Sequence, residues 1–439
     1  MTTKQVPEGY LFSKGYTYYV FALLCLLMMT DFADRMIISS LLPLIKAEWG
    51  LTDAQSGQLV SAVFFSMFLF VIPVSILVDR WSRRKSIFIM STLWSVACAA
   101  GAFVTGYSHL LTARAFIGIG EAAYNPAAMA TISAIFPEKR RAVMIGVFNA
   151  FISIGMVVGM MVGAYVAVRW GWRTAFGVVA LPGFILAILI YFTKEYKTVP
   201  LEQTVAAVAT GSTAEVHKSK MTKAQIIKDF FRKPSLVAVY IVFAAASYVY
   251  VSMITFLPTY YVRVQGVTLQ VATAMTSGPI FLMIFAGAIG GWMVDRWMLK
   301  DLRARLYFPS ICYCLSSLAL MCAFGLFSGG AIVYQYILLL IGFFLHIAAG
   351  PACISITQEV IHPGVRAMAY GVGLVFQHML GSAPGPAVTG ALSDKFGLPA
   401  ALTFSSGIGL VAAVALLIGS FYYKKDRDSV EKVTLRPEE

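Results

Sequence analysis

The stretch YTYYVFALLCLLMMTDFADRMIISSLL, residues 16–42, is apolar except for a charged group at its centre, Asp31, Asp34 and Arg35. Its 27 residues would extend about 40 Å as a helix, which is enough to cross a bilayer. Each charge in the middle of such a span costs about 2.5–3.5 kcal/mol unless partners or water relieve it. A simple membrane anchor has no use for these charges, so we interpret them as functional.

The rest of the chain has the same apolar character. Of its 439 residues, 59% are hydrophobic and 13% are charged, and the mean hydropathy is +0.77. This composition predicts an all-α membrane protein with twelve transmembrane helices. The net charge of +13 is interpreted as a feature of membrane topology and not as a sign of nucleic-acid binding. The apolar spans lie near residues 16–42, 56–78, 86–105, 110–135, 142–168, 174–193, 236–262, 269–294, 306–327, 331–358, 367–392 and 399–423.

The two halves of the chain repeat each other. Asp79-Arg80 reappears as Asp295-Arg296, and Asn125-Pro126-Ala127 is matched by Gly350-Pro351-Ala352. Six spans in each half predict two six-helix pseudo-symmetric bundles in parallel orientation, with a substrate cavity between them. The predicted units are an N-terminal bundle (1–193), a cytoplasmic linker with an amphipathic interfacial helix (194–234), a C-terminal bundle (235–423) and a cytoplasmic tail (424–439).

Lys and Arg are concentrated in alternate connecting segments. The positive-inside rule therefore places both termini in the cytoplasm. The first apolar run is too long for a cleavable signal peptide, so we expect it to remain as a helix. The predicted location is a multi-pass protein of the bacterial inner (plasma) membrane.

Other classes of function find no support in the residues. The six cysteines all fall within apolar spans without metal-ligand spacing, so neither disulfides nor a metal site is predicted. No nucleotide-binding loop or nucleophile–base set occurs outside the spans, so we expect no catalytic residues, no cofactor and no enzyme. A membrane-embedded enzyme and a transporter-like receptor remain as alternatives.

The charged group in the first span has possible partners in the fourth, where Arg114 and Glu121 lie seven residues apart. Three acids then face two arginines, and a surplus buried carboxyl favours its neutral form. We expect Asp34, Glu121 or Asp31 to couple transport to protons, with Arg35 changing partner. The alternative is a set of static ion pairs that hold the two helices together.

The second half lacks intramembrane charge, and the repeat places His346 where Glu121 stands in the first. The first half is therefore expected to handle protons and the second to recognise the substrate. The residues predicted to bind substrate are Arg35, Arg114, Tyr124, Tyr248, Tyr250, His346 and His378. The residues predicted to gate the cytoplasmic ends are Asp79, Arg80, Arg83, Arg84, Asp295 and Arg296.

Glycine and proline predict special backbone contacts. Gly155, Gly159 and Gly163 are spaced for close helix approach, which we expect at a contact that slides during transport. Pro126 and Pro351, with Pro279, Pro384 and Pro386, are expected to break or kink helices beside a cavity.

Several motifs resemble those of the major facilitator superfamily. The segment Ser75-Ile-Leu-Val-Asp79-Arg80-Trp-Ser-Arg-Arg-Lys85 is similar to its loop motif between helices two and three, and Gly291-Trp-Met-Val-Asp295-Arg296 is a second copy. Arg114-Ala-Phe-Ile-Gly118 is similar to its helix-four motif. The resemblance implies the major facilitator fold and secondary active transport by alternating access.

Within that superfamily the chain resembles Spinster-type transporters. The resemblance is carried by Asp34-Arg35, by Gly118-Ile-Gly120-Glu121-Ala-Ala-Tyr124 and by His378-Met-Leu-Gly381-Ser-Ala-Pro384, although Ser382 stands where such proteins usually have Asp. It implies proton-linked movement of lysolipids or sphingoid lipids. A small organic carboxylate, held by arginines, is the alternative substrate. The expected partners are a small molecule, protons and the lipid bilayer, and the expected state is a monomer.

Overall fold

The computed structural model describes residues 10–80, 82–195, 229–330, 332–362 and 365–430. Within these ranges the secondary structure is entirely helical, which confirms the predicted all-α class. The N-terminal helices are α1 (Lys14–Trp49), α2 (Asp53–Arg80), α3 (Arg83–Ala100), α4 (Tyr107–Glu121), α5 (Tyr124–Ile135), α6 (Glu138–Trp170) and α7 (Trp172–Tyr191). The C-terminal helices are α10 (Pro234–Arg263), α11 (Leu269–Met298), α12 (Ala304–Gly325), α13 (Ile332–Ala348), α14 (Gly350–Glu359), α15 (Arg366–Phe376), η2 (Gln377–Ser382), α16 (Pro384–Phe396) and α17 (Leu398–Asp428).

These helices of the described residues make twelve consecutive spans, because α4–α5, α13–α14 and α15–η2–α16 are each one interrupted span. Among the residues searched, eight helices are long and apolar enough to cross a membrane by length and composition. The other four spans are α1, which contains the charged group, α3, which begins with three basic residues, and the interrupted spans α4–α5 and α15–η2–α16.

Proline accounts for two of the interruptions. Pro126 and Pro351 each lie in the first turn of the second segment, α5 and α14. Proline has no N–H to donate to the carbonyl four residues earlier, so the helix is broken there. In the third interrupted span, Ala383 N–H donates to the carbonyl of His378 five residues back, which makes the π-helical turn η2 just before Pro384. The predicted irregularities therefore occur at these prolines, whereas Pro279 lies inside the continuous helix α11.

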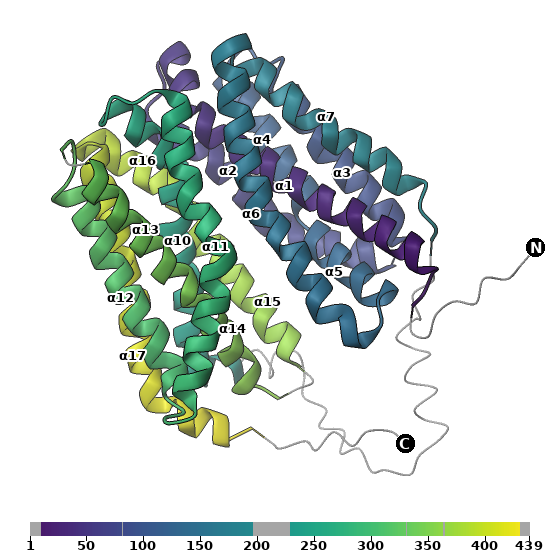
Figure 1. The fold of residues 1–439 in the computed structure, drawn as a ribbon, viewed down its shortest axis with the longest axis vertical. Coiled ribbons are helices and arrows are strands. Elements are labelled where there is room, and N and C mark those ends of the chain that lie inside the picture. Colours follow the sequence, from purple (N-terminus) through teal and green to yellow (C-terminus); the bar gives the residue numbers. More distant parts are fainter. Residues whose placement is uncertain (1–9, 81, 196–228, 331, 363–364, 431–439) are drawn as a thin grey trace, which may run out of the picture.

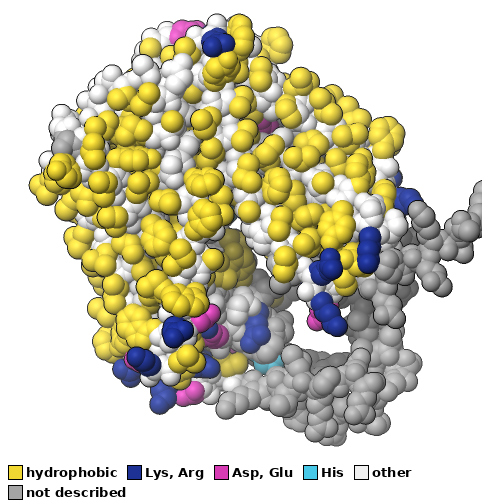
Figure 2. Space-filling view, in the orientation of Figure 1, with side chains coloured by type: hydrophobic (Ala, Val, Ile, Leu, Met, Phe, Trp, Pro, Cys, Tyr) yellow, Lys and Arg dark blue, Asp and Glu magenta, His cyan; other side chains and the backbone are white. Residues whose placement is uncertain are grey.

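The spans form two lobes, α1–α7 and α10–α17 (Figure 1). The lobes meet where α2 begins and α16 ends, at the top of the view, and we call this the closed end. The opposite end, where α1 begins and α17 ends, is the open end. There a hollow separates the lobes, with hydrophobic side chains deep inside it (Figure 2).

The glycines of α6 pack against α1 of the same lobe. An added Cβ at Gly155 would lie 2.3 Å from the carbonyl oxygen of Met29, and one at Gly159 would lie 2.4 Å from that of Ala33. The close approach was predicted, but its expected place at a sliding contact is wrong, because both helices belong to one lobe. The contact instead fixes the face of α1 that carries Met29 and Ala33.

The predicted boundaries of the linker and tail remain predictions. The amphipathic helix expected at residues 221–232 falls largely outside the described residues, as does most of the tail. The described start of the C-terminal lobe is held by Asp426 of α17, which accepts hydrogen bonds from the backbone N–H and the hydroxyl of Ser235. This carboxylate caps the first turn of α10.

Candidate functional site

Three charged side chains meet in the interior of the N-terminal lobe, and we call Asp31, Arg35 and Glu121 the central cluster. Arg35 Nη2 lies 2.9 Å from Glu121 Oε2 and 3.1 Å from Asp31 Oδ1, and its Nε donates to Glu121 Oε2 at 3.0 Å. All three residues are buried. The guanidinium also lies 4.4 Å from the ring centre of Phe32, at cation–π distance. One buried arginine thus forms ion pairs with two buried carboxylates.

The second arginine, Arg114, is bound to backbone instead of to acids. It is fully buried and donates to the carbonyl oxygens of Leu59, Asp34 and Arg35 at 3.1–3.3 Å. It therefore ties α4 to α1 and α2 just where the central cluster is anchored. In this conformation Arg114 therefore positions α4 against α1 and α2.

Asp34 is the acid without an ionic partner. It is fully buried, and among the described residues neither carboxyl oxygen has a hydrogen-bond partner. The Cys98 thiol and the Arg114 guanidinium lie near enough to act on its charge. Of the three acids expected in this region, the structure joins Asp31 and Glu121 through Arg35 and leaves Asp34 apart.

Local sequence explains the position of Glu121. Gly118 and Gly120 precede it, and added Cβ atoms there would lie 2.2 Å from the Val63 carbonyl oxygen and 2.8 Å from the Trp94 nitrogen. Only glycine lets α4 approach α2 and α3 this closely. Glu121 is then the last residue of α4, at the break before α5. A helix end at mid-span leaves room for a side chain to turn toward Arg35.

Tyr124 fixes the segment after the break. It is fully buried, and its hydroxyl donates to the carbonyl oxygen of Leu24 on α1 at 2.7 Å. Its ring packs edge-on against Trp94, with centroids 5.1 Å apart. The predicted substrate-binding tyrosine thus holds α5 against α1 in this conformation.

In the C-terminal lobe, His346 lies near the corresponding break, between α13 and α14. Its Nε2 is 3.1 Å from the carbonyl oxygen of Ala246, and its ring packs edge-on against Tyr313 and parallel to Tyr250. The histidine is buried and its Nε2 is satisfied by backbone. It occupies the repeat position of Glu121 and forms no ion pair with any described residue.

Tyr250 and His378 are less well satisfied. The Tyr250 hydroxyl has two sulfur partners, Met283 Sδ at 3.0 Å and Met156 Sδ at 3.6 Å, and sulfur is a weak acceptor. His378 lies in the π-turn η2, and its buried Nδ1 has no partner among the described residues. Its ring stacks on Phe64 of the other lobe at 6.2 Å.

Tyr248 and Ser382 belong to the packing of the C-terminal lobe. Tyr248 is buried, and its carbonyl oxygen would lie 3.1 Å from a Cβ added at Gly385 of α16. Ser382, the departure from the Spinster pattern, shares a hydrogen bond with Ser247 of α10. Both contacts hold the interrupted span against α10.

Arg84, Asp295 and Arg296, three of the predicted gating residues, each make contacts within their own lobe. Arg84 donates to the carbonyl oxygen of Thr193 at 2.7 Å and to Glu195 at 3.3 Å, and Arg83 lies beside it. Asp295 pairs with Arg305 at 3.1 Å, and Arg296 lies over the Trp292 ring. The side chains of Asp79 and Arg80 lie outside the described part of the chain. A latch between the lobes at the open end remains a prediction for another conformation.

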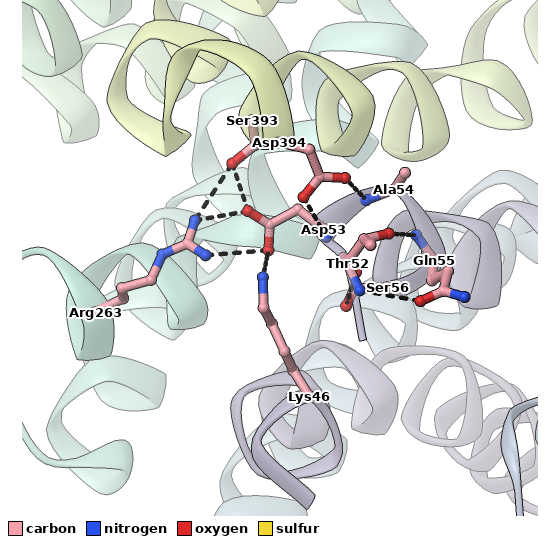
Figure 3. A network of polar contacts seen from close by, with 9 residues as sticks. All are labelled: Lys46, Thr52, Asp53, Ala54, Gln55, Ser56, Arg263, Ser393 and Asp394. Carbon is pink, nitrogen blue, oxygen red and sulfur yellow. Dashed lines mark hydrogen bonds and ion pairs between the residues drawn. The ribbon is translucent and has the colours of Figure 1, made fainter. Parts of the chain in front are cut away.

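A network that the sequence did not predict joins the lobes at the closed end (Figure 3). The carboxylate of Asp53, at the start of α2, accepts hydrogen bonds from both terminal guanidinium nitrogens of Arg263, at 3.1 and 2.8 Å. It also accepts hydrogen bonds from the Ser393 hydroxyl and the Lys46 ammonium group. Asp394 of α16 accepts from the backbone N–H groups of Asp53 and Ala54 at 2.7 and 2.9 Å. We call these residues, Lys46, Asp53, Arg263, Ser393 and Asp394, the closed-end network.

The backbone at this end is also packed closely across the lobes. A Cβ added at Gly57 of α2 would lie 2.1 Å from the Pro386 carbonyl oxygen, and one at Gly390 would lie 2.1 Å from that of Asp53. Only glycine permits these two approaches. The start of α2 therefore receives one ionic partner, Arg263, and a helix cap, Asp394, from the other lobe.

A signal for this network exists in the repeat. At an offset of 216, Asp53 corresponds to Leu269, and at 226 Asp394 corresponds to Val168. Both acids thus interrupt an otherwise repeated pattern, and each is bound by the opposite lobe: Asp53 by Arg263, and Asp394 by backbone N–H groups at the start of α2. Comparing the two halves for unmatched charges would have pointed to them.

The chain belongs to the Major Facilitator Superfamily, whose family model matches residues 24–386. The fold agrees with this: twelve spans in two lobes, with mid-span breaks and a polar centre. The predicted fold class is therefore confirmed. The chain is a multi-pass membrane protein and a secondary transporter, and not an enzyme.

Similar curated proteins include sugar-acid transporters and Spinster homologs. The chain is 25% identical to the hexuronate transporter of Bacillus subtilis over 88% of this chain and 90% of the relative. It is 29% identical to the D-galactonate transporter of Escherichia coli, over 88% and 92%. It is 27% identical to protein spinster homolog 3 of Danio rerio, over 98% and 90%. The predicted resemblance to Spinster proteins is confirmed, and it is shared with sugar-acid transporters.

A solved structure shares the fold. It is a crystal structure of a bacterial homolog to the human lysosomal transporter Spinster in an inward-facing, unoccupied conformation, with a TM-score of 0.82 and 20% identity. The match covers 95% of this chain and 99% of that one. The similarity extends over both lobes, so the two chains share the overall arrangement of their spans.

Proposed function

We propose that this transporter moves an organic anion together with a proton. The observation that carries the proposal is the sharing of Arg35 between Asp31 and Glu121. Protonation of either carboxyl would weaken its hold on the arginine and leave guanidinium charge for a substrate. A proton and an anion would then bind the same buried group in turn.

Charge balance supports this coupling. A buried carboxylate without a partner is costly, so we take Asp34 as neutral in this conformation. Two ionised acids, Asp31 and Glu121, then balance Arg35 and Arg114. One added proton gives the site a net positive charge, and one bound carboxylate restores neutrality. The empty site and the fully loaded site would both be neutral. Only these two forms could change conformation without the free-energy cost of burying an uncompensated charge.

The C-terminal lobe would supply the neutral contacts. Tyr250 and His378 each carry a polar atom that the protein leaves weakly satisfied or without a partner. A polyhydroxylated acid could accept hydrogen bonds from these groups while its carboxylate binds Arg35. Arg114 and Tyr124 would act as positioning residues, since both are bound to backbone carbonyls.

The names of the relatives agree with a sugar acid as substrate. Two similar proteins are called hexuronate and D-galactonate transporters. We propose a monocarboxylate of this kind, taken up as a proton symport by a monomer, since one chain contains both lobes. We also propose that the open end and both termini are cytoplasmic, following the positive-inside rule.

Transport in proteoliposomes tests this proposal. An inward proton gradient should drive accumulation of glucuronate or galactonate. Glu121→Gln removes the titrating group but keeps a polar side chain, so it should abolish gradient-driven accumulation and retain substrate exchange without a gradient. If accumulation by Glu121→Gln and by Asp31→Asn both equalled that of the wild type, proton coupling at this site would be excluded.

The Spinster resemblance gives the second candidate, an amphiphilic lipid. Hydrophobic side chains deep in the hollow would suit an acyl chain (Figure 2). Uptake of a labelled lysophospholipid by the same vesicles, with no uptake of sugar acids, would favour this substrate over the first.

A further inference from the structure

A second polar site lies in the N-terminal lobe, away from the central cluster. A cavity opens between α1, α3, α5 and α7 at the open end. Its inner wall is apolar and includes the buried side chains of Val20, Leu24 and Ile135. Its rim carries three cationic side chains, Arg83, Arg84 and Lys194. The transport mechanism proposed above makes no use of this cavity.

The rim is built to hold an anion. Arg84 is fixed by its bond to the Thr193 carbonyl oxygen, at 2.7 Å, while its buried Nε has no partner among the described residues. Lys194 is held in place by a bond from its backbone N–H to the Tyr16 hydroxyl, at 2.5 Å. A fixed guanidinium with further cationic side chains on the same rim suits the several oxygens of a phosphate group.

The protein places an anion of its own here. Glu195 alone is acidic among the described residues that line the cavity, and it lies 3.3 Å from Arg84 Nη2. Its side chain is 40% exposed, so it can leave the arginine at little cost. Its carboxylate marks the place that an external anion would take.

The position of the rim favours a lipid as the source of that anion. The end of α7 beside the cavity exposes Tyr191 and Phe192, as is typical of residues at a membrane interface. Basic pockets between transmembrane helices on the positively charged side bind acidic lipid head groups. We propose that this rim binds the phosphate of an anionic phospholipid, in competition with Glu195.

This proposal is independent of the transported substrate. Binding would release Glu195 from Arg84 at the end of α7, where the chain leaves the N-terminal lobe.

Native mass spectrometry of the full-length protein, released from nanodiscs of mixed phosphatidylglycerol and phosphatidylcholine, tests the site. Phosphatidylglycerol should be retained preferentially. Glu195→Gln removes the competing carboxylate and should raise retention, while Arg84→Gln should lower it about fivefold, as expected for one cation near an anionic lipid. Glu48→Gln is the matched control, because it breaks a Glu–Arg pair of the same lobe at the closed end. Glu48→Gln should leave the retention of phosphatidylglycerol at the wild-type level.

Three results would overturn the proposal. Both lipids carry a phosphate and differ in net charge, so equal retention of the two would exclude a site selective for anionic lipid. Equal retention of phosphatidylglycerol by Glu195→Gln and Glu48→Gln would exclude this cavity as the binding site. This comparison does not depend on Arg84→Gln, so it still tests the proposal if that variant fails to fold. Displacement of phosphatidylglycerol by an equal concentration of inorganic phosphate would assign the rim to a free anion and not to a lipid.

Discussion

The central cluster and the closed-end network both pair acidic residues with an arginine, but they differ in which lobes supply the partners. Asp31, Arg35 and Glu121 all belong to the N-terminal lobe. Asp53 and Arg263 belong to different lobes. When the lobes rock, partners within one lobe move together, whereas partners in different lobes separate. The first arrangement can hold a proton throughout a transport cycle, and the second must break in each cycle.

Removing the arginine of the central cluster should have the largest effect. Arg35→Gln leaves two buried carboxylates without their cation, and breaking a buried ion pair in this way costs about 3–5 kcal/mol. We expect sugar-acid uptake to fall more than about 100-fold, together with a lower melting temperature in detergent. Arg169→Gln, at an arginine on the closed-end surface, serves as a control. Wild-type uptake by Arg35→Gln would remove the central cluster from the mechanism.

Placing a carboxylate in the other lobe sharpens the comparison. His346→Glu introduces an acid at the repeat position of Glu121, with no arginine contact to balance it, at a cost of about 2.5–3.5 kcal/mol. The yield of folded protein and its melting temperature should both fall.

His346→Gln is the matched control for that variant. Its amide can still donate to the Ala246 carbonyl oxygen, so it should change stability by less than about 1 kcal/mol. Equal stability of the two variants would show that position 346 tolerates charge without a local cation.

Weakening the closed-end network should shift the conformation without unfolding the protein. Asp53→Asn reduces the charge-assisted bonds to Arg263, each worth about 1.5–3 kcal/mol. The population open at this end should rise by at least about tenfold. Spin labels at Val168→Cys and Leu326→Cys, both exposed near this end, would report a longer distance in double electron–electron resonance.

Glu48→Gln is the control for Asp53→Asn. Glu48 binds Arg173 and Trp172 at the same end but within one lobe. In Glu48→Gln, the distance between the two spin labels should therefore equal that in the labelled protein with an intact closed-end network. A shift of similar size in both variants would show that loss of any charge at this end opens it.

The smallest effect is expected at the open end. Asp295→Asn breaks a pair with Arg305 in which the aspartate side chain is 70% exposed. Exposed pairs contribute little, so stability should stay within about 0.5 kcal/mol of the wild type. A calorimetric or fluorescence melting curve measures this. A large loss would indicate that the pair has a partner in the other lobe that this conformation separates.

The residues of the central cluster could be predicted because charge inside an apolar span is costly and therefore conspicuous. Asp31 and Arg35 are four apart on one helix, and depth along the fourth span brings Glu121 to the same level. The acceptors of Arg114 could not be predicted, since every span offers backbone carbonyls. The break at Pro126 was predicted from proline alone, and the structure adds that Glu121 ends the helix there.

The closed-end network escaped prediction for the opposite reason. Charges at the ends of spans are common and cost little, so Asp53 and Arg263 did not stand out. Their pairing depends on how the lobes tilt toward each other, which is set by backbone contacts such as Gly57 with Pro386. No periodicity within one span contains that information.

Because Asp394 caps the start of α2 from the other lobe, the transport cycle requires a change in hydration at this end. The N–H groups of Asp53 and Ala54 are satisfied by the other lobe only while this end is shut. Once the lobes part, these donors and both carboxylates must be hydrated. The conformation that is open at this end therefore takes up solvent there, and a lowered water activity, as in concentrated osmolyte, favours the shut form.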